Sequence, residues 1–166
     1  MWGDILESKE LYSKIVLRIR EILGENLRAI IVFGSTIYMG RGNDIDLIVV
    51  TDEEMNMKDR LKLEYRLKQV LQRIVKDKIF NVHVFNLEEF ERNLQPGSML
   101  SGLALGYEVI YGEQIVEPLI LNFLKQLSRG KYILHNRYGT WNLSYHARIT
   151  YKLKLRKIIG KKEPKL

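Results

Sequence analysis

The stretch IIVFGSTIYMGRGNDIDLIVV, from Ile30 to Val50, decides the fold that we expect for this chain. It opens with the apolar run Ile30-Ile31-Val32-Phe33, which is typical of a buried strand, and Gly34-Ser35 interrupts that run. Ten residues after Gly34, Asp44-Ile45-Asp46 begins a second apolar run. Side chains two apart on a strand point to the same face. We therefore expect the two Asp side chains to project together while the apolar residues beside them enter the core.

The paired Asp residues are candidate metal ligands. Two carboxylates held side by side repel each other, and a cation between them offsets that repulsion. Carboxylate oxygens are hard ligands that suit Mg²⁺ or Mn²⁺. We therefore take Asp44 and Asp46 as metal-binding and catalytic candidates. If Asp-x-Asp stood alone, a solvent-facing strand edge with two charges would be the better interpretation.

The Gly-Ser pair upstream adds a candidate phosphate site. A Gly at the end of a buried strand permits a sharp turn and lets a phosphate approach the backbone. If a helix begins near Ser35, its first N–H groups and its dipole favour an anion. Gly34 and Ser35 are therefore candidate phosphate ligands, and Arg41 in the following loop is a third. The sequence thus predicts a phosphate site and a metal site that face each other across one short segment.

This order of features resembles the nucleotidyltransferase superfamily related to DNA polymerase β, and in particular its minimal (MNT-type) domains. Gly34-Ser35, the spacer Thr36–Asn43 and Asp44-Ile45-Asp46 match the motif in order and spacing, and the resemblance covers about residues 27–113. It implies transfer of NMP from an NTP to a hydroxyl acceptor, with release of pyrophosphate. It also implies Mg²⁺ or Mn²⁺ as the cofactor.

The resembled family has a third carboxylate on a later strand, which we expect here at about Ile79–Phe85. The resemblance places that position on Asn81, with His83 two residues later on the same face. Asn81 offers a carbonyl oxygen without charge, whereas the imidazole of His83 can accept a proton. Three hypotheses follow: a weakened enzyme, a catalytically degenerate protein that binds nucleotide or RNA, or an MNT-type antitoxin that pairs with a HEPN-like partner.

Hydrophobic periodicity predicts an α+β fold, a mixed β-sheet flanked by helices, with a C-terminal helical extension. We divide the chain into a nucleotidyltransferase-like domain, residues 1–113, and a basic helical extension, residues 114–166. Beside the strands already named, a strand-like segment is expected around 106–112. Helices are expected at about 5–23, from 51–54 to about 75, from about 87, at 99–105, from 117–118 to about 129, and over 138–159.

The positive charge gathers near the C-terminus. Residues 122–166 contain 12 Lys and Arg and one acid, a net charge of +11, whereas residues 1–121 contain 15 and 19, a net charge of −4. This distribution favours a polyanionic partner. The candidate nucleic-acid contacts, which alternate with aromatic residues, are Arg148, Lys152, Lys154, Arg156 and Lys157. The same pattern also fits a solvated basic helix face, or a face that docks on the acidic part of another subunit.

The composition sets outer limits on the function. With 46% hydrophobic and 28% charged residues, the 166-residue chain resembles a soluble globular protein. The sequence contains no cysteine, which excludes disulfides and thiolate metal sites. No apolar run approaches the length of a membrane span, and the acidic N-terminus is unlike a secretory signal. We therefore expect no membrane partner and a cytoplasmic location.

Overall fold

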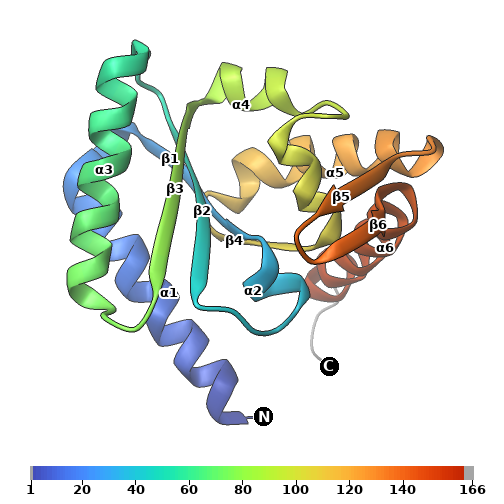
Figure 1. Cartoon of the computed structure of the whole chain (residues 1–166), viewed down its shortest axis with the longest axis horizontal. Helices are drawn as coiled ribbons and strands as arrows, with labels where there is room; N and C mark the ends of the chain where they lie inside the picture. Colours follow the sequence, from blue (N-terminus) through green and yellow to red (C-terminus); the bar gives the residue numbers. More distant parts are fainter. Residues whose placement is uncertain (1, 163–166) are drawn as a thin grey trace.

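The computed structural model describes residues 2–162, with side chains from residue 8 to residue 160. A four-stranded sheet in the order β3-β2-β1-β4 stands at its centre, with helices on both faces (Figure 1). No helix within the described residues is long and apolar enough to cross a membrane. In chain order, the elements are α1 (Trp2–Leu23), the 3-10 turn η1 (Gly24–Asn26), β1 (Leu27–Phe33), α2 (Ser35–Tyr38), β2 (Asp44–Thr51), α3 (Met57–Ile74), β3 (Ile79–Asn86), α4 (Leu87–Asn93), the 3-10 helix η2 (Met99–Leu105), β4 (Tyr107–Tyr111), α5 (Glu113–Arg129), β5 (Ile133–Asn136), β6 (Gly139–Asn142) and α6 (Leu143–Lys162).

The sheet is mixed, as predicted. β1 pairs antiparallel with β2 and with β4, whereas β2 and β3 run parallel and are joined through α3. A parallel pair needs a long crossover of this kind because the chain must return to the same end of the sheet. The register pairs Asp46 with Phe33 on one side and with Asn81 on the other. The end of β1 and the starts of β2 and β3 are thereby brought together.

Each face of the sheet has its own apolar core. α1 and α3 cover one face, and α5, α6 and η2 cover the other (Figure 1). Side chains alternate along β2, so that Ile45 and Leu47 are buried toward α1 and α3 while Ile48 is buried toward α5 and α6. Asp44 and Asp46 lie on the same side of β2 as Ile48 and are only half-buried. The two carboxylates therefore project from the face that carries the C-terminal helices.

The helix predicted to begin at residues 51–54 begins six residues later. Thr51 still pairs with Leu27 as the last residue of β2, so it cannot cap a helix. Asn56 caps α3 instead, and its side-chain oxygen accepts a hydrogen bond from the Asp59 backbone N–H at 2.9 Å. The acids at 52–54 lie in the connecting loop.

Two boundaries of the C-terminal segment also differ from the prediction. α5 begins at Glu113, so that Pro118 lies inside the helix rather than at its start. An antiparallel hairpin, β5–β6, occupies residues 133–142, where no strand was expected, and α6 consequently begins at Leu143 rather than near residue 138. The hairpin forms because Asn136 accepts a hydrogen bond from the Tyr138 N–H at 2.9 Å, and Gly139 supplies a positive φ after the two-residue turn.

We predict that the approach of α5 to β1 is sensitive to a single methyl group at Gly112. Gly112 has φ 75°, and a Cβ there would overlap the backbone of Arg28 and Ala29. Gly24, with φ 55°, has nothing within 4 Å of its Cβ position and serves as the control. Gly24→Ala should cost only the backbone strain of about 1–2 kcal/mol, and Gly112→Ala should lower the free energy of unfolding further. Urea unfolding measures both, and equal losses would contradict this contact.

Candidate active site

The candidate site lies where β1 ends and β2 and β3 begin, beside the single turn of α2 (Figure 1). Gly34 joins β1 to α2 with φ 84° and ψ −167°. A Cβ at residue 34 would overlap the carboxylate of Asp46. Glycine therefore serves two purposes here, because it permits the turn and lets the backbone pass against the carboxylate.

The loop between α2 and β2 folds back over the same corner. Ser35 is buried at the start of α2, and a Cβ on Gly42 would lie 3.3 Å from its Oγ. The Thr36 hydroxyl donates to the carbonyl of Asp44, which ties α2 to the start of β2. Arg41 is exposed in this loop. The residues predicted to bind phosphate are thus placed around one corner of the sheet, next to the paired carboxylates.

Each of the two carboxylates accepts a hydrogen bond from a residue that is distant in sequence. Asp46 Oδ1 accepts from Asn81 Nδ2 at 3.0 Å. Asp44 Oδ2 accepts from Arg137 Nη2 at 3.2 Å, which is also an ion pair. The hydrogen bond with Asp44 raises the pKa of Arg137 further above its usual range. The repulsion between the carboxylates is therefore offset by an amide on one side and a guanidinium on the other.

Asn81, rather than His83, lies beside the carboxylates. The register sets Asn81 directly against Asp46, whereas His83 is paired with Ile48 further along the strand. The His83 ring packs edge-on against Phe33, with 6.3 Å between ring centroids. His83 is therefore packed against Phe33, and Asn81 lies beside Asp46, at the position to which the resemblance assigns a third carboxylate.

The sequence analysis missed Arg137. It lies in the turn of the β5–β6 hairpin, which packs on α2 through aromatic rings. Tyr38 makes edge-on contacts with Tyr138 and Trp141, with ring centroids 6.4 and 5.3 Å apart. The turn signature Asn136 to Gly139 could have predicted the hairpin. Nothing in the local sequence could have indicated which part of the sheet the turn would meet.

The donors at this corner fit a magnesium ion. Mg²⁺ is commonly held by one or two carboxylates together with substrate phosphates and water, and Asp44 and Asp46 supply such a pair. Among the described side chains, no group of three or more His, Asp or Glu is placed to hold a metal. The protein thus offers an incomplete set of ligands that phosphate oxygens would complete.

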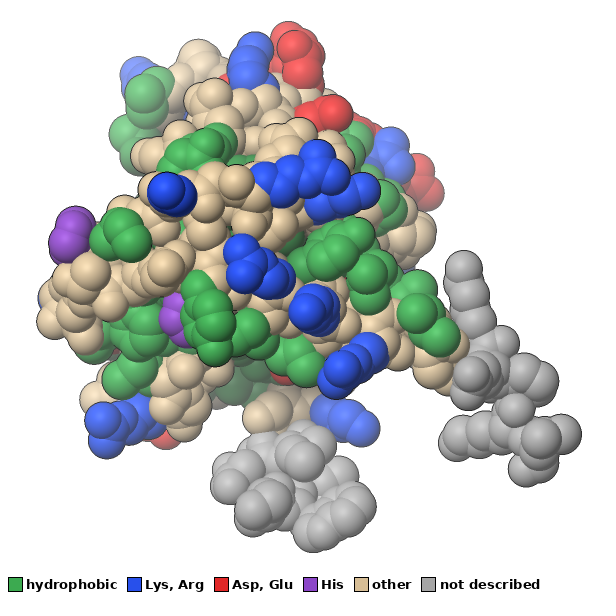
Figure 2. Space-filling view, turned by 90° about the vertical axis from the view of Figure 1, so that its right-hand side faces the viewer, with side chains coloured by type: hydrophobic (Ala, Val, Ile, Leu, Met, Phe, Trp, Pro, Cys, Tyr) green, Lys and Arg blue, Asp and Glu red, His purple; other side chains and the backbone are tan. Residues whose placement is uncertain are grey.

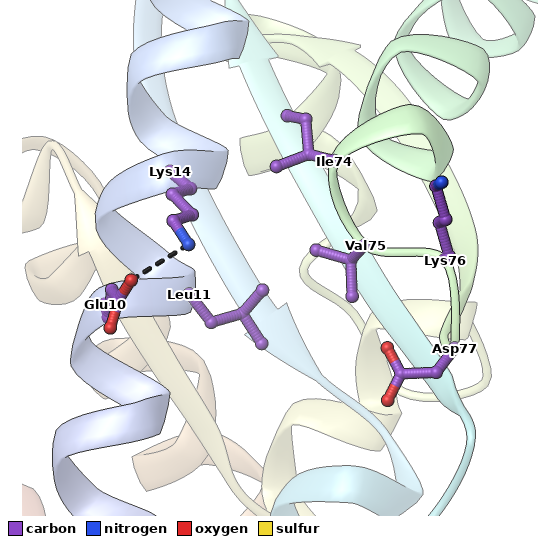
Figure 3. Close-up of a pocket in the computed structure, with 7 residues that line it drawn as sticks. All are labelled: Glu10, Leu11, Lys14, Ile74, Val75, Lys76 and Asp77. Carbon is purple, nitrogen blue, oxygen red and sulfur yellow. Dashed lines mark ion pairs between the residues drawn. The ribbon is translucent and has the colours of Figure 1, made fainter.

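A separate groove of about 420 Å³ lies between α1 and the connection from α3 to β3 (Figure 3). Glu10 and Lys14 form an ion pair at 2.9 Å on one wall, and Asp77 lines the other. Asp77 is the acid nearest to Asn81 in the sequence before β3. Because it lines a groove against α1, on the other side of the sheet from the paired Asp residues, it does not supply the missing carboxylate.

The structure separates the five basic residues predicted to contact nucleic acid. Arg148, Lys152 and Arg156 are exposed on α6. Lys154 is half-buried, with Nζ 4.1 Å from the centroid of the Tyr107 ring, and burial lowers its pKa while Glu117 opposes this shift. Lys157 is exposed and lines a small pocket together with Lys154 and Glu117.

Tyr107 and Glu117 explain the position of Lys154. The Tyr107 hydroxyl donates to the buried Glu117 Oε1 at 2.7 Å. Burial, together with this hydrogen bond, raises the pKa of Tyr107. A buried carboxylate is stabilised by a nearby cation. The ammonium group of Lys154 lies over the face of the Tyr107 ring, close to this hydrogen bond. The charge of Lys154 is therefore directed inward.

Comparison with known proteins finds one family model that resembles the central part of the chain. Residues 18–96 match the family described as polymerase beta, nucleotidyltransferase. This match confirms the resemblance predicted from the Gly-Ser and Asp-x-Asp motifs. A search among curated proteins found no match.

Several solved structures are also similar to this chain. The complex of a tri-AMPylated HEPN toxin with an MNT antitoxin from Shewanella oneidensis contains a chain with 14% identity and a TM-score of 0.44, covering 91% of this chain and 98% of that one. A toxin–antitoxin complex with AMP-PNP has 15% identity and a TM-score of 0.44, with coverages of 88% and 97%. The MntA–HepT toxin–antitoxin complex has 14% identity and a TM-score of 0.43, with coverages of 90% and 98%.

Proposed function

We propose that the protein binds an NTP with Mg²⁺ and transfers its NMP group to a hydroxyl acceptor. The observation that carries this proposal is the packing of the Gly34 backbone against the Asp46 carboxylate, with Asp44 projecting from the same face. A glycine turn beside paired carboxylates can place phosphate oxygens next to a metal held by those carboxylates. The match of residues 18–96 to a nucleotidyltransferase family supports the same reaction class.

The proposed roles follow from the positions of the residues. Asp44 and Asp46 would hold Mg²⁺, which when bound stabilises negative charge on the phosphates during in-line transfer. Gly34 and Ser35 would orient the β- and γ-phosphates, and Arg41, which is exposed in the following loop, is the third proposed phosphate ligand. Asn81 keeps the Asp46 carboxylate in place through its 3.0 Å hydrogen bond.

Because residue 81 is an uncharged Asn and not a carboxylate, we expect NMP transfer to be slow. Its amide donates to Asp46, so in this arrangement its NH₂ group, and not a carboxylate, faces the metal ligands. A missing third carboxylate removes charge near the attacking hydroxyl and removes help in its activation. Binding of Mg²⁺–NTP depends on the remaining groups and should survive. A protein that binds nucleotide without transferring it is therefore the limiting case of this proposal.

A second proposal concerns the outward face of α6, and its partner is an acidic protein surface. We define this face by its exposed residues, three basic and four apolar: Arg148, Lys152, Arg156, Tyr145, Ile149, Leu153 and Ile159. Helical spacing brings them to one side, because residues three or four apart are neighbours on a helix. Figure 2 shows Lys and Arg mixed with hydrophobic side chains across this side of the molecule, with Asp and Glu mainly at its upper edge.

The exposed apolar residues of this face favour a protein over a nucleic acid as its partner. Bases stack on aromatic rings and phosphates pair with cations, but exposed aliphatic side chains contribute little to either contact. Ile149, Leu153 and Ile159 are 38%, 54% and 59% exposed. Aliphatic residues grouped on one helix face are typical of a protein interface, and the basic residues between them are complementary to an acidic partner. A HEPN-like protein is one partner of this kind, and RNA is the alternative that the experiment below separates.

We predict that Asp44→Asn combined with Asp46→Asn abolishes Mg²⁺- or Mn²⁺-dependent NTP binding, because the metal loses both charged ligands. The fold should survive, since both side chains are half-buried at the start of a strand. Asp52→Asn is the matched control, because Asp52 follows the other end of β2 and pairs with Arg28. Calorimetric titration compares the variants, and unchanged affinity in the double variant would contradict the site assignment.

We predict that Asn81→Asp increases the rate of NMP transfer, because it adds a carboxylate beside Asp46. Activation of the attacking hydroxyl is worth on the order of 10²–10⁴ in rate. Asn81→Ala, which removes the amide without adding charge, should give no gain. Incorporation of labelled NMP into RNA or a protein acceptor at matched Mg²⁺ measures the rates. Fast transfer by the wild type that Asn81→Asp slows would show that His83 or another group already supplies the missing function.

We predict that replacing Arg148, Lys152 and Arg156 with Gln weakens binding to an acidic protein partner, and that Ile149→Ser with Leu153→Ser weakens it further. Replacing the exposed Lys58, Arg66 and Lys68 of α3 with Gln removes the same charge elsewhere and is the control. Affinity is measured against a HEPN-like protein, the partner proposed above, and separately against RNA over a range of salt concentrations. Strongly salt-dependent RNA binding that the Ser variants do not alter would overturn the protein interface.

A further inference from the structure

The β5–β6 hairpin brings a cation to the candidate metal site from the far end of the chain. Arg137 and Asp44 are 93 residues apart, and their side chains meet at 3.2 Å. The Arg137 side chain is 70% exposed and that of Asp44 is 27% exposed. The guanidinium also lies over the Tyr138 ring, 4.8 Å from its centroid. Arg137 is thus held at the site but remains open to solvent.

The hairpin is anchored on both sides of this residue. Within the hairpin, Asn136 Oδ1 accepts hydrogen bonds from the Tyr138 N–H and from Trp141 Nε1, at 2.9 and 3.1 Å. At its base, the Tyr132 N–H donates to Ser144 Oγ at 3.0 Å, which connects the hairpin to α6. The rings of Tyr138 and Trp141 pack against Tyr38 of α2, as described above. These contacts set the turn beside the start of β2, with the exposed Arg137 side chain next to Asp44.

The ion pair between Arg137 and Asp44 contributes little to the stability of the fold. An exposed ion pair contributes little to folding, because solvent screens the charges and the side chains lose entropy. The Asp44 carboxylate that it occupies is also a proposed metal ligand. A Mg²⁺ ion held by Asp44 would bring a second positive charge beside the guanidinium, and repulsion between the two cations favours movement of Arg137 away from Asp44. The displaced guanidinium would then lie next to the phosphates that complete the metal coordination.

We infer that Arg137 is a nucleotide-binding residue: it pairs with Asp44 when the metal site is empty and with the triphosphate when Mg²⁺–NTP is bound. A guanidinium presents five N–H donors in a planar fork, which suits phosphate oxygens as well as a carboxylate. This inference rests on the proposed function of the site. It makes the C-terminal hairpin part of the nucleotide site, and it gives Arg137 opposite effects on the binding of metal alone and of metal with nucleotide.

The test is a pair of calorimetric titrations of Arg137→Gln, one with metal alone and one with metal and nucleotide. With Mn²⁺ alone, the variant should bind more tightly than the wild type by up to about fivefold, because the competing cation is gone. With whichever of the four Mg²⁺–NTPs the wild type binds best, the variant should bind about tenfold more weakly or worse, because a charged hydrogen bond to phosphate is lost. Arg137→Lys keeps the charge but lacks the planar fork of donors, so its affinities should lie between those of the wild type and of Arg137→Gln.

Lys131→Gln is the matched control, because Lys131 is exposed at the base of the same hairpin and carries the same charge. It should leave both affinities unchanged. If Arg137→Gln weakens NTP binding no more than Lys131→Gln does, Arg137 is a surface ion-pair partner and the inference is wrong. If the wild type itself binds none of the four Mg²⁺–NTPs, the proposed function of the site fails, and this inference fails with it.

Discussion

The contact between the Gly34 backbone and the Asp46 carboxylate is the constraint on which the rest of the site depends. The register of β1 on β2 sets Phe33 opposite Asp46, so the chain leaving β1 must turn beside a carboxylate. Only a residue without a Cβ can make that turn at φ 84°. The turn starts α2, whose Thr36 hydroxyl then binds the Asp44 carbonyl. One missing methyl group therefore places the loop, the helix turn and both carboxylates relative to each other.

The charge balance at this corner suits a site that exchanges its partners. Two carboxylates would repel each other, and here each accepts one hydrogen bond from a group of different strength, the neutral Asn81 and the cationic Arg137. The amide comes from within the sheet, where register holds it. The guanidinium comes from an exposed turn, where an ion pair contributes little to stability. A carboxylate at residue 81 would add a third negative charge at this corner, and the neutral Asn81 avoids that repulsion.

The C-terminal segment does more than extend the domain. α5 and α6 close the core on one face of the sheet, where Phe123, Leu124 and Ala147 are buried with strand residues such as Ile31. Lys154 is directed toward the Tyr107–Glu117 hydrogen bond, whereas Lys152, two residues earlier, is exposed. The net charge of the segment therefore divides into an inner part that balances a buried acid and an outer part that is available to a partner.

The sequence by itself determined the features whose physical cause is local. The alternation of Asp44, Ile45 and Asp46, and the glycine after an apolar strand, predict a strand pair with two carboxylates on one face, and the fold and the family match agree with that. The start of α3 was misplaced because a capping pattern at Thr51 competed with strand pairing, which depends on β1. Such errors arise where a residue has a local preference and a distant partner disagrees with it.

Only the tertiary structure decided what distant segments do to this site. The turn that carries Arg137 has a local signature, but its contact with Asp44 depends on how α5 and α6 pack on the sheet and on the rings that join the hairpin to α2. The rotation of α6 about its axis likewise separates Lys154 from Lys152, although their sequence surroundings are similar. Both outcomes depend on the burial of apolar side chains, because that burial contributes more to stability than exposed ion pairs do.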